Sequence, residues 1–243
     1  MPATPPPAPP LDRAPPRPFL WLCGFLAFTL LWDLSGLDMA VMRAVGSPQG
    51  FALRHDWLLE RVLHDGLHKT MVAAFVLLCG WALWPRAHLP RRERIAVLAL
   101  AVLSLLAVNL VKYNSLTSCP WELEAFGRNA RWVSHWAWGQ ADGGTGRCFP
   151  GGHASSGFAF LALCLPWLLP PDGVLRRRVV GLRWLAAALG VGLLSGVVQT
   201  LRGAHFPSHT MWTLLICASV SLAGWQFVRS HPGTAAARAR RSE

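Results

Sequence analysis

The sequence predicts an all-α, polytopic membrane protein whose core is a bundle of six transmembrane helices. Its 243 residues are 53% hydrophobic and only 14% charged, with a mean hydropathy of +0.34. Soluble domains carry roughly 25% charged residues, so this chain has too few charges to cover a water-exposed surface. A spanning helix needs roughly 17 to 25 mostly apolar residues. Six such runs are found, at residues 19–37, 70–84, 95–111, 154–171, 184–200 and 210–228.

Each run has its own features. Arg13 and Arg17 precede the first, as they would in a cleaved signal peptide, but WDLSGLD at its end offers no small-residue cleavage site. We therefore expect a retained membrane anchor. The second run is short and needs flanking residues, the third carries no charge, and the fourth ends at two prolines. The fifth contains Gly190, Gly192 and Gly196, which predict close contact with neighbouring helices.

The distribution of Lys and Arg predicts the orientation of the chain. With the N-terminus inside, the inside segments carry a net charge of +10 and the outside segments +1, out of a total of +11. This asymmetry follows the positive-inside rule and places both termini in the cytoplasm. It also argues against a nucleic-acid partner, because such proteins gather their basic residues on one water-exposed face.

The sequence divides into four segments. Residues 1–18 form a Pro-rich cytoplasmic tail that we expect to be disordered, and residues 229–243 form a basic cytoplasmic tail. Residues 19–94 hold the first two transmembrane helices with the outer loop between them. Residues 95–228 hold the other four and the unusual polar residues described next.

Ionisable side chains from separate parts of the chain gather on the outer face. Lys112 ends the third run, His153 opens the fourth after Gly151 and Gly152, and the turn RGAHFPSH after the fifth run places Arg202, His205 and His209 there. A glycine turn at a helix N-terminus presents N–H groups to an anion. Arg and Lys neutralise phosphate. One neutral His can attack phosphorus, and a second, protonated His can donate a proton to the leaving oxygen. The set therefore suits phosphoryl transfer without a metal or other cofactor.

Three motifs in this region resemble those of the type 2 phosphatidic acid phosphatase (PAP2) superfamily. They read KYNSLTSCP from Lys112, PGGH from Pro150 and QTLRGAHFPSH from Gln199. The resemblance implies a PAP2-like catalytic core over residues 95–228, with His205 as nucleophile, His153 as general acid, and Lys112 and Gly152 at the phosphate. It implies a membrane-embedded phosphatase that acts on lipid phosphates at the periplasmic face of a bacterial inner membrane. Candidate substrates are phosphatidic acid, phosphatidylglycerophosphate, undecaprenyl pyrophosphate and lipid A phosphates.

The chain departs from the family pattern at four positions. Cys119 and Gln199 stand where the family has Arg, and Gly151 stands where it has Ser. Arg202 lies about one helical turn after Gln199, so we expect it to reach the same phosphate. His209 stands where a carboxylate orients the nucleophilic His, a large effect in comparable triads. Three explanations stay open: another acid (Asp142 or Glu122) replaces that carboxylate, neutral His209 orients His205, or the activity is weak.

Two cysteines lie outside the apolar runs, Cys119 in the first motif and Cys148 just before the second. The outer face of such a membrane is oxidising, so we expect them to form a disulfide. It would join the first motif to the turn before His153, as a covalent link where the family has a charged residue.

Several other interpretations compete with the phosphatase. The same site could transfer the phosphoryl group to a lipid hydroxyl, or the protein could bind anionic lipid without catalysis. His205 and His209, with His153, could hold zinc, and Ser155 or Ser156 could be a protease nucleophile. Three histidines of the first outer loop could control substrate access, but we expect ordinary surface residues there: His55, His64 and His68. The oligomeric state is left open.

Overall fold

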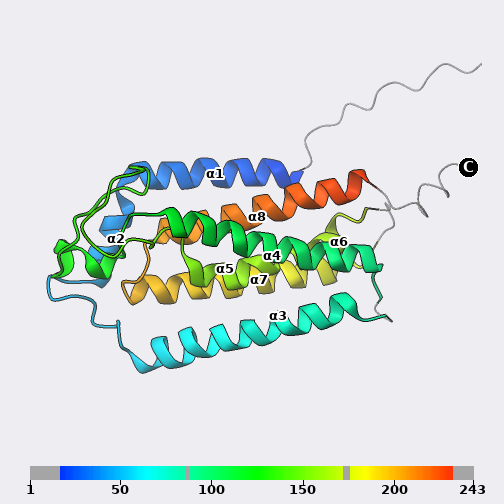
Figure 1. Cartoon of the computed structure of the whole chain (residues 1–243), viewed down its shortest axis with the longest axis horizontal. Helices are drawn as coiled ribbons and strands as arrows, with labels where there is room; N and C mark the ends of the chain where they lie inside the picture. Colours follow the sequence, from blue (N-terminus) through cyan, green and yellow to red (C-terminus); the bar gives the residue numbers. More distant parts are fainter. Residues whose placement is uncertain (1–16, 86–87, 172–175, 232–243) are drawn as a thin grey trace, which may run out of the picture.

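The computed structural model describes residues 17–85, 88–171 and 176–231, which form a bundle of helices (Figure 1). The tails predicted at 1–18 and 229–243 lie almost entirely outside the described residues. The first helix begins and the last helix ends at the same end of the bundle, and the long loop of residues 115–151 lies at the other end (Figure 1). The arrangement agrees with a chain whose termini share one side of a membrane.

The first predicted run forms α1 (Arg17–Ser35), at one edge of the bundle (Figure 1). It ends at Gly36, whose φ of 73° is left-handed, and α2 (Leu37–Val45) follows in a new direction. Near its end, Asp33 accepts hydrogen bonds from the indoles of Trp136, at 3.1 Å, and Trp212, at 2.9 Å. These bonds connect α1 to the long loop and to the last helix.

The second predicted run is longer than the sequence suggested. Helix α3 (Leu67–Leu83) continues without a break from η1 (Leu58–Gly66), a π-helical segment, so the apolar helix extends over Leu58–Leu83. Charged residues in η1 made this part look like a loop, and the expected start at residue 70 is wrong. π-helical turns are rare and occur frequently at functional sites.

Three further helices are long and apolar: α4 (Arg91–Asn114), α7 (Arg178–Leu201) and α8 (Pro207–Ser230). With α1 and the η1–α3 helix, the described part of the chain has five helices that could cross a membrane. The fourth predicted run instead forms a shorter apolar segment, Gly152–Leu168. The count of six spans is therefore not confirmed.

The shorter segment consists of α5 (Gly152–Phe158), η4 (Ala159–Cys164) and α6 (Leu165–Leu168). Its middle part, η4, is a 3₁₀-helix. A 3₁₀-helix rises about 2.0 Å per residue and an α-helix about 1.5 Å, so the segment is about 28 Å long. That is close to the thickness of the hydrocarbon core, about 30 Å. The 3₁₀ geometry adds about 3 Å to the length that the same residues would have as an α-helix.

Close contact between α5 and α7 depends on glycines. A Cβ atom on Gly157 would lie 2.4 Å from the backbone nitrogen of Gly192, and one on Gly192 would lie 2.2 Å from the ring of Phe158. A Cβ on Gly196 would lie 2.3 Å from Thr210 of α8. The predicted close approach is confirmed at Gly192 and Gly196 but wrong at Gly190, where a Cβ would meet nothing within 4 Å. The contact holds the start of α5 beside the end of α7.

Candidate active site

The predicted site residues meet at the end of the bundle that holds the long loop. Lys112 comes from the end of α4, His153 from the first turn of α5, His205 from the turn before α8, and His209 from the first turn of α8. The ring centroids of His153 and His205 lie 6.5 Å apart, and those of His205 and His209 lie 5.6 Å apart. The structure therefore brings together the three histidines that the sequence singled out.

Lys112 lies against the glycine turn. A Cβ atom on Gly152 would lie 3.8 Å from the Lys112 ammonium nitrogen. The lysine is partly buried, and its positive charge acts electrostatically on His153, His205 and His209. Among the described residues it forms neither a hydrogen bond nor an ion pair. An unpaired cation in a partly buried position is costly, and an anion at this place would stabilise it.

His205 is held through one of its two ring nitrogens. Its Nδ1 lies 3.5 Å from Nδ1 of His209 and 3.3 Å from Sγ of Cys148. Neither contact uses Nε2, so this nitrogen is left for a substrate. Burial lowers the pKa of His205 well below its usual value, and the charges of Lys112 and His153 act in the same direction. His205 is therefore neutral, the form that a nucleophile requires.

A disulfide joins Cys119 and Cys148, with an S–S distance of 2.01 Å. It ties the first motif to the turn before His153 and lies against His205. The two sulfur atoms and a ring nitrogen of His205 fall within 4.8 Å of one another, a spacing that a metal site could use. Metals bind the thiolate form, however, and sulfur atoms in a disulfide are poor ligands.

The structure separates the three explanations for the missing carboxylate. Asp142 accepts bonds from the Ser118 hydroxyl at 2.8 Å and from the Gly144 amide at 3.0 Å. Glu122 accepts bonds from the Cys119 amide at 3.0 Å and from the Thr145 hydroxyl at 2.7 Å. Both acids therefore brace the long loop. The group beside Nδ1 of His205 is instead the buried imidazole of His209.

Two expected phosphate contacts are used differently. The Gly151 amide donates to the carbonyl of His209 at 3.2 Å, so it is not free for an anion. The buried guanidinium of Arg202 donates to Glu60 and to the carbonyl of Arg54, both at 3.0 Å, and to Gln199 Oε1 at 3.2 Å. Because its three nitrogens are engaged, Arg202 fixes the site wall instead of offering a free charge to phosphate.

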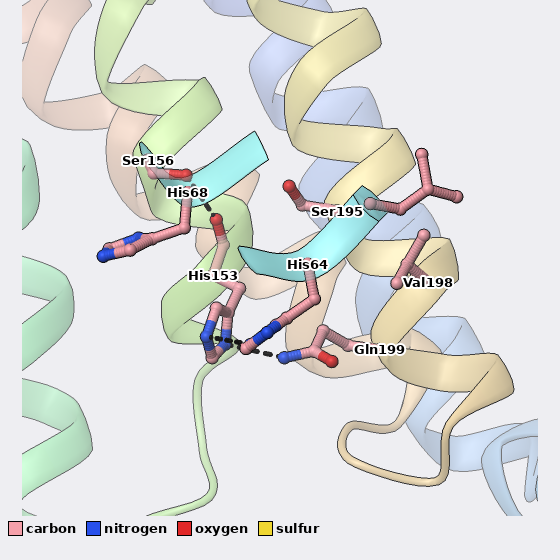
Figure 2. A pocket seen from close by; sticks show the side chains of 8 residues that line it. His64, His68, His153, Ser156, Ser195, Val198 and Gln199 are labelled. Carbon is pink, nitrogen blue, oxygen red and sulfur yellow. Dashed lines mark hydrogen bonds between the residues drawn. The ribbon is translucent and has the colours of Figure 1, made fainter. Parts of the chain in front are cut away.

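His153 is held at both ring nitrogens (Figure 2). Nδ1 lies 2.7 Å from Nε2 of Gln199, the residue that stands where the family has Arg. Nε2 lies 2.7 Å from Nε2 of His64. Ser156, one turn along α5, donates to the His153 carbonyl at 2.7 Å, and Ser155 donates to the Gly152 carbonyl at 2.6 Å. Both serines therefore stabilise the helix end.

His64 is the site residue that sequence reasoning missed. We expected the histidines of the first outer loop to be surface residues, which holds for His55, with a 75% exposed side chain. It also holds for His68, which is exposed although it lines the edge of the pocket. It is wrong for His64, which is 23% exposed and bonded to His153. The available signal was the spacing of Glu60 and His64: residues four apart share a helix face, and a helical reading of this loop would have turned both toward the site.

An apolar cleft lies along α3 and α7, and its lining begins about one helical turn from residues of the histidine pocket. The pocket is lined by His64 and His68 on one side and by Ser195, Val198 and Gln199 on the other. The cleft beyond it has a volume of about 530 Å³. Its walls are mainly apolar side chains of α3, η4, α6 and α7: Met71, Ala74, Leu77, Leu78, Trp81, Phe160, Leu163, Trp167, Trp184, Ala187, Ala188 and Val191. It lies between elements of the predicted membrane region.

Comparison with protein families decides the identity of this fold. The family model described as PAP2 superfamily matches residues 92–232, more than half of the chain. The chain belongs to the PAP2 superfamily. Comparisons with curated proteins and with solved structures found no match. The matched region includes Lys112, His153 and His205, whereas Glu60, His64 and Asp65 precede it.

Proposed function

We propose that this PAP2 protein is an integral membrane phosphatase that removes phosphate from a lipid through a phosphohistidine on His205. The observation that carries the proposal is the ammonium of Lys112, which has no partner among the described residues and acts electrostatically on both His153 and His205. A phosphate group at this place would supply the missing counter-charge. Burial keeps His205 neutral, and its Nε2 is left unused by the contacts of the ring.

The chemistry follows in two steps. Nε2 of His205 attacks phosphorus, the P–N bond forms, and the bond from phosphorus to the lipid oxygen breaks. The resemblance assigns the proton for that oxygen to a general acid at His153, on the opposite side of the site. Water then attacks phosphohistidine and releases phosphate and neutral His205. A lipid hydroxyl in place of water would make the same site a phosphotransferase.

The apolar cleft supports a lipid as substrate. Between His68 and Trp81, α3 rises about 20 Å at about 1.5 Å per residue. An acyl or prenyl chain along these apolar walls would bring its phosphate to the histidine pocket. We also propose that the site faces the periplasm, since α1 begins and α8 ends at the other end of the bundle and the predicted inside segments carry most of the positive charge.

The test measures phosphate release from a panel of lipids in detergent micelles. The panel holds phosphatidic acid, phosphatidylglycerophosphate, undecaprenyl pyrophosphate and lipid A. We expect His205→Ala to lose about 10³-fold or more of the rate on the preferred lipid. Acid quenching of the wild type should trap an acid-labile phosphoenzyme that the variant lacks.

The control is His88→Ala, which removes an exposed histidine between α3 and α4. It should keep the wild-type rate. Equal phosphate release by wild type and His205→Ala would reject the phosphatase and favour a protein that binds anionic lipid without catalysis. Loss of lipid phosphate without release of free phosphate would identify a phosphotransferase.

A further inference from the structure

The side of the pocket opposite His205 holds two histidines, and they differ in their partners. His153 has no carboxylate on either ring nitrogen. His64, in contrast, lies 2.8 Å from Oδ1 of Asp65 through Nδ1, and its Nε2 faces His153. The carboxylate that pairs with a histidine in this pocket therefore belongs to a residue outside the matched family region.

The direction of each hydrogen bond follows from Arg202. A guanidinium only donates, so the atom of Gln199 that faces it is the oxygen, Oε1. The amide nitrogen of Gln199 then donates to Nδ1 of His153, at 2.7 Å. His153 Nδ1 therefore carries no proton, and the single proton of the neutral ring is on Nε2.

That proton fixes the state of His64. His153 Nε2–H donates to Nε2 of His64, so the proton of neutral His64 is on Nδ1 and is donated to Asp65 (Figure 2 shows the bonds at His153). The series runs in one direction, from Arg202 through Gln199, His153 and His64 to the carboxylate. Every donor in it meets an acceptor.

A general acid needs one more proton than this resting state holds. On His153 that proton would go to Nδ1, where the N–H of Gln199 already points, and Arg202 prevents the amide from turning over. On His64 it would go to Nε2, which becomes free for a proton once Nε2–H of His153 donates to a phosphate oxygen instead of to His64. Asp65 would then stabilise the resulting imidazolium as a carboxylate does in a catalytic triad. Asp65 also lies 3.6 Å from the guanidinium of Arg61.

We propose that His64, paired with Asp65, is the general acid of this enzyme and that His153 is a hydrogen-bond donor to the phosphate. This inference rests on the proposed function and reassigns the role that the family resemblance gives to His153. The partly exposed His64 takes a proton from water onto Nε2 and gives it to the lipid oxygen as the bond from phosphorus to that oxygen breaks. In the second step neutral His64 takes a proton from the attacking water.

The position of His64 suits this role. It lies in the π-helical segment η1, one turn after Glu60, the acid that holds Arg202. Other ionisable groups also face the pocket, and none has the same partners: the ring of His68 lies 6.4 Å from that of His153, and Lys112 approaches from α4. The segment η1 thus supplies His64, the proposed acid. It also supplies Glu60, which holds Arg202, and Arg202 determines the tautomers along the series.

The test compares two leaving groups. Phosphatidic acid releases an alkyl oxygen that needs a proton, whereas 4-nitrophenyl phosphate releases a phenolate that does not. We expect His64→Ala to lower kcat/KM about 10²–10⁴-fold on phosphatidic acid and less than about threefold on 4-nitrophenyl phosphate. Since kcat/KM covers only the steps up to phosphoenzyme formation, the later hydrolysis does not enter the comparison. The retained aryl activity also shows that the variant is folded.

Three further variants complete the test. Asp65→Asn should show the same selectivity with a smaller loss, because it removes the charge and keeps the shape. His153→Ala should lose activity on both substrates alike, because the His153 side chain is proposed to bind the phosphate that both substrates share. The proposal would be overturned if His153→Ala, and not His64→Ala, lost kcat/KM on phosphatidic acid alone. It would also be overturned if His64→Ala lost kcat/KM equally on both substrates. His205→Ala should inactivate the enzyme on both substrates, and failure of that result would reject the proposed function itself.

Discussion

The two sides of the histidine pocket are built from different kinds of group. On the side of the proposed nucleophile, His205 is buried beside His209 and the disulfide sulfur of Cys148. On the opposite side, His153 and His64 belong to a series that begins at a guanidinium and ends at a carboxylate. Burial is enough to keep a nucleophile neutral, whereas an acid must hold a charge. Among the described residues, His64 is the histidine of this pocket that is bonded to a carboxylate, and it is the one that would have to become cationic.

The largest effect is expected from removing the neutral partner of the nucleophile. His209→Ala leaves Nδ1 of His205 without its imidazole neighbour and with Cys148 as its remaining contact, so the tautomer with a free Nε2 is fixed less firmly. We expect kcat to fall about 10²-fold, by analogy with triads that lose their orienting group. The measurement is phosphate release from the preferred lipid.

A matched variant sharpens the comparison. His209→Asp introduces the carboxylate that the family has at this position. Activity at or above the wild-type level would show that a carboxylate and an imidazole can orient the same nucleophile. Wild-type activity in His209→Ala would show instead that His209 does not orient His205. The neutral partner on the His205 side of the pocket would then have no role like that of Asp65 on the His64 side.

The second largest effect is expected at the contact between α5 and α7, which holds His153 beside Gln199. Gly192→Ala would place a methyl group 2.2 Å from the ring of Phe158 and push α7 away from α5. Such overpacking costs about 1–3 kcal/mol, roughly a factor of 5 to 150 in the folding equilibrium. Gly190→Ala is the control, because a Cβ there meets nothing within 4 Å. Residual activity after heating should fall for Gly192→Ala only; an equal loss in both variants would contradict the contact.

The smallest effect concerns pH. The pKa of His205 is lower in the folded protein than in the unfolded chain, so the unfolded chain binds more protons once the pH falls below about 6.5. Stability contributed by neutral His205 is therefore present above that pH and is lost below it, by at most about tenfold in the folding equilibrium per pH unit. His205→Gln should flatten this dependence in acid-unfolding measurements followed by circular dichroism, which do not require activity. An unchanged slope would mean that His205 is protonated in the folded protein.

Much of the site could be predicted from sequence because its parts lie in recognisable motifs. Lys112, His153 and His205 each end or begin a helix, so the order of the helices alone brings them to one end of the bundle. The close approach at Gly192 followed from its size in an apolar helix. The roles of Gly151 and Arg202 could not be predicted in this way. They depend on which acceptors lie next to the Gly151 amide and the Arg202 guanidinium in the folded protein, and sequence spacing does not give that information.

The missed part is η1. Its charged residues, among them Glu60 and Asp65, look like a loop when hydropathy is averaged along the chain. In the folded protein those charges are stabilised by Arg202, His64 and Arg61, so the segment continues a membrane helix. No local pattern marks such compensation, because the partners of Glu60 and His64 are about 90 to 140 residues away in the sequence.

The close contact of α5 with α7 has a consequence for timing. Because these helices touch at Gly157 and Gly192, we expect them to move as one body that keeps His153 beside Gln199. The apolar cleft separates this body from α3, which lies at the edge of the bundle (Figure 1). Admission of a lipid from the bilayer would then displace α3 together with η1, and His64 with it. The proton donor would be withdrawn whenever the cleft is open and restored only after the chain has closed around its substrate.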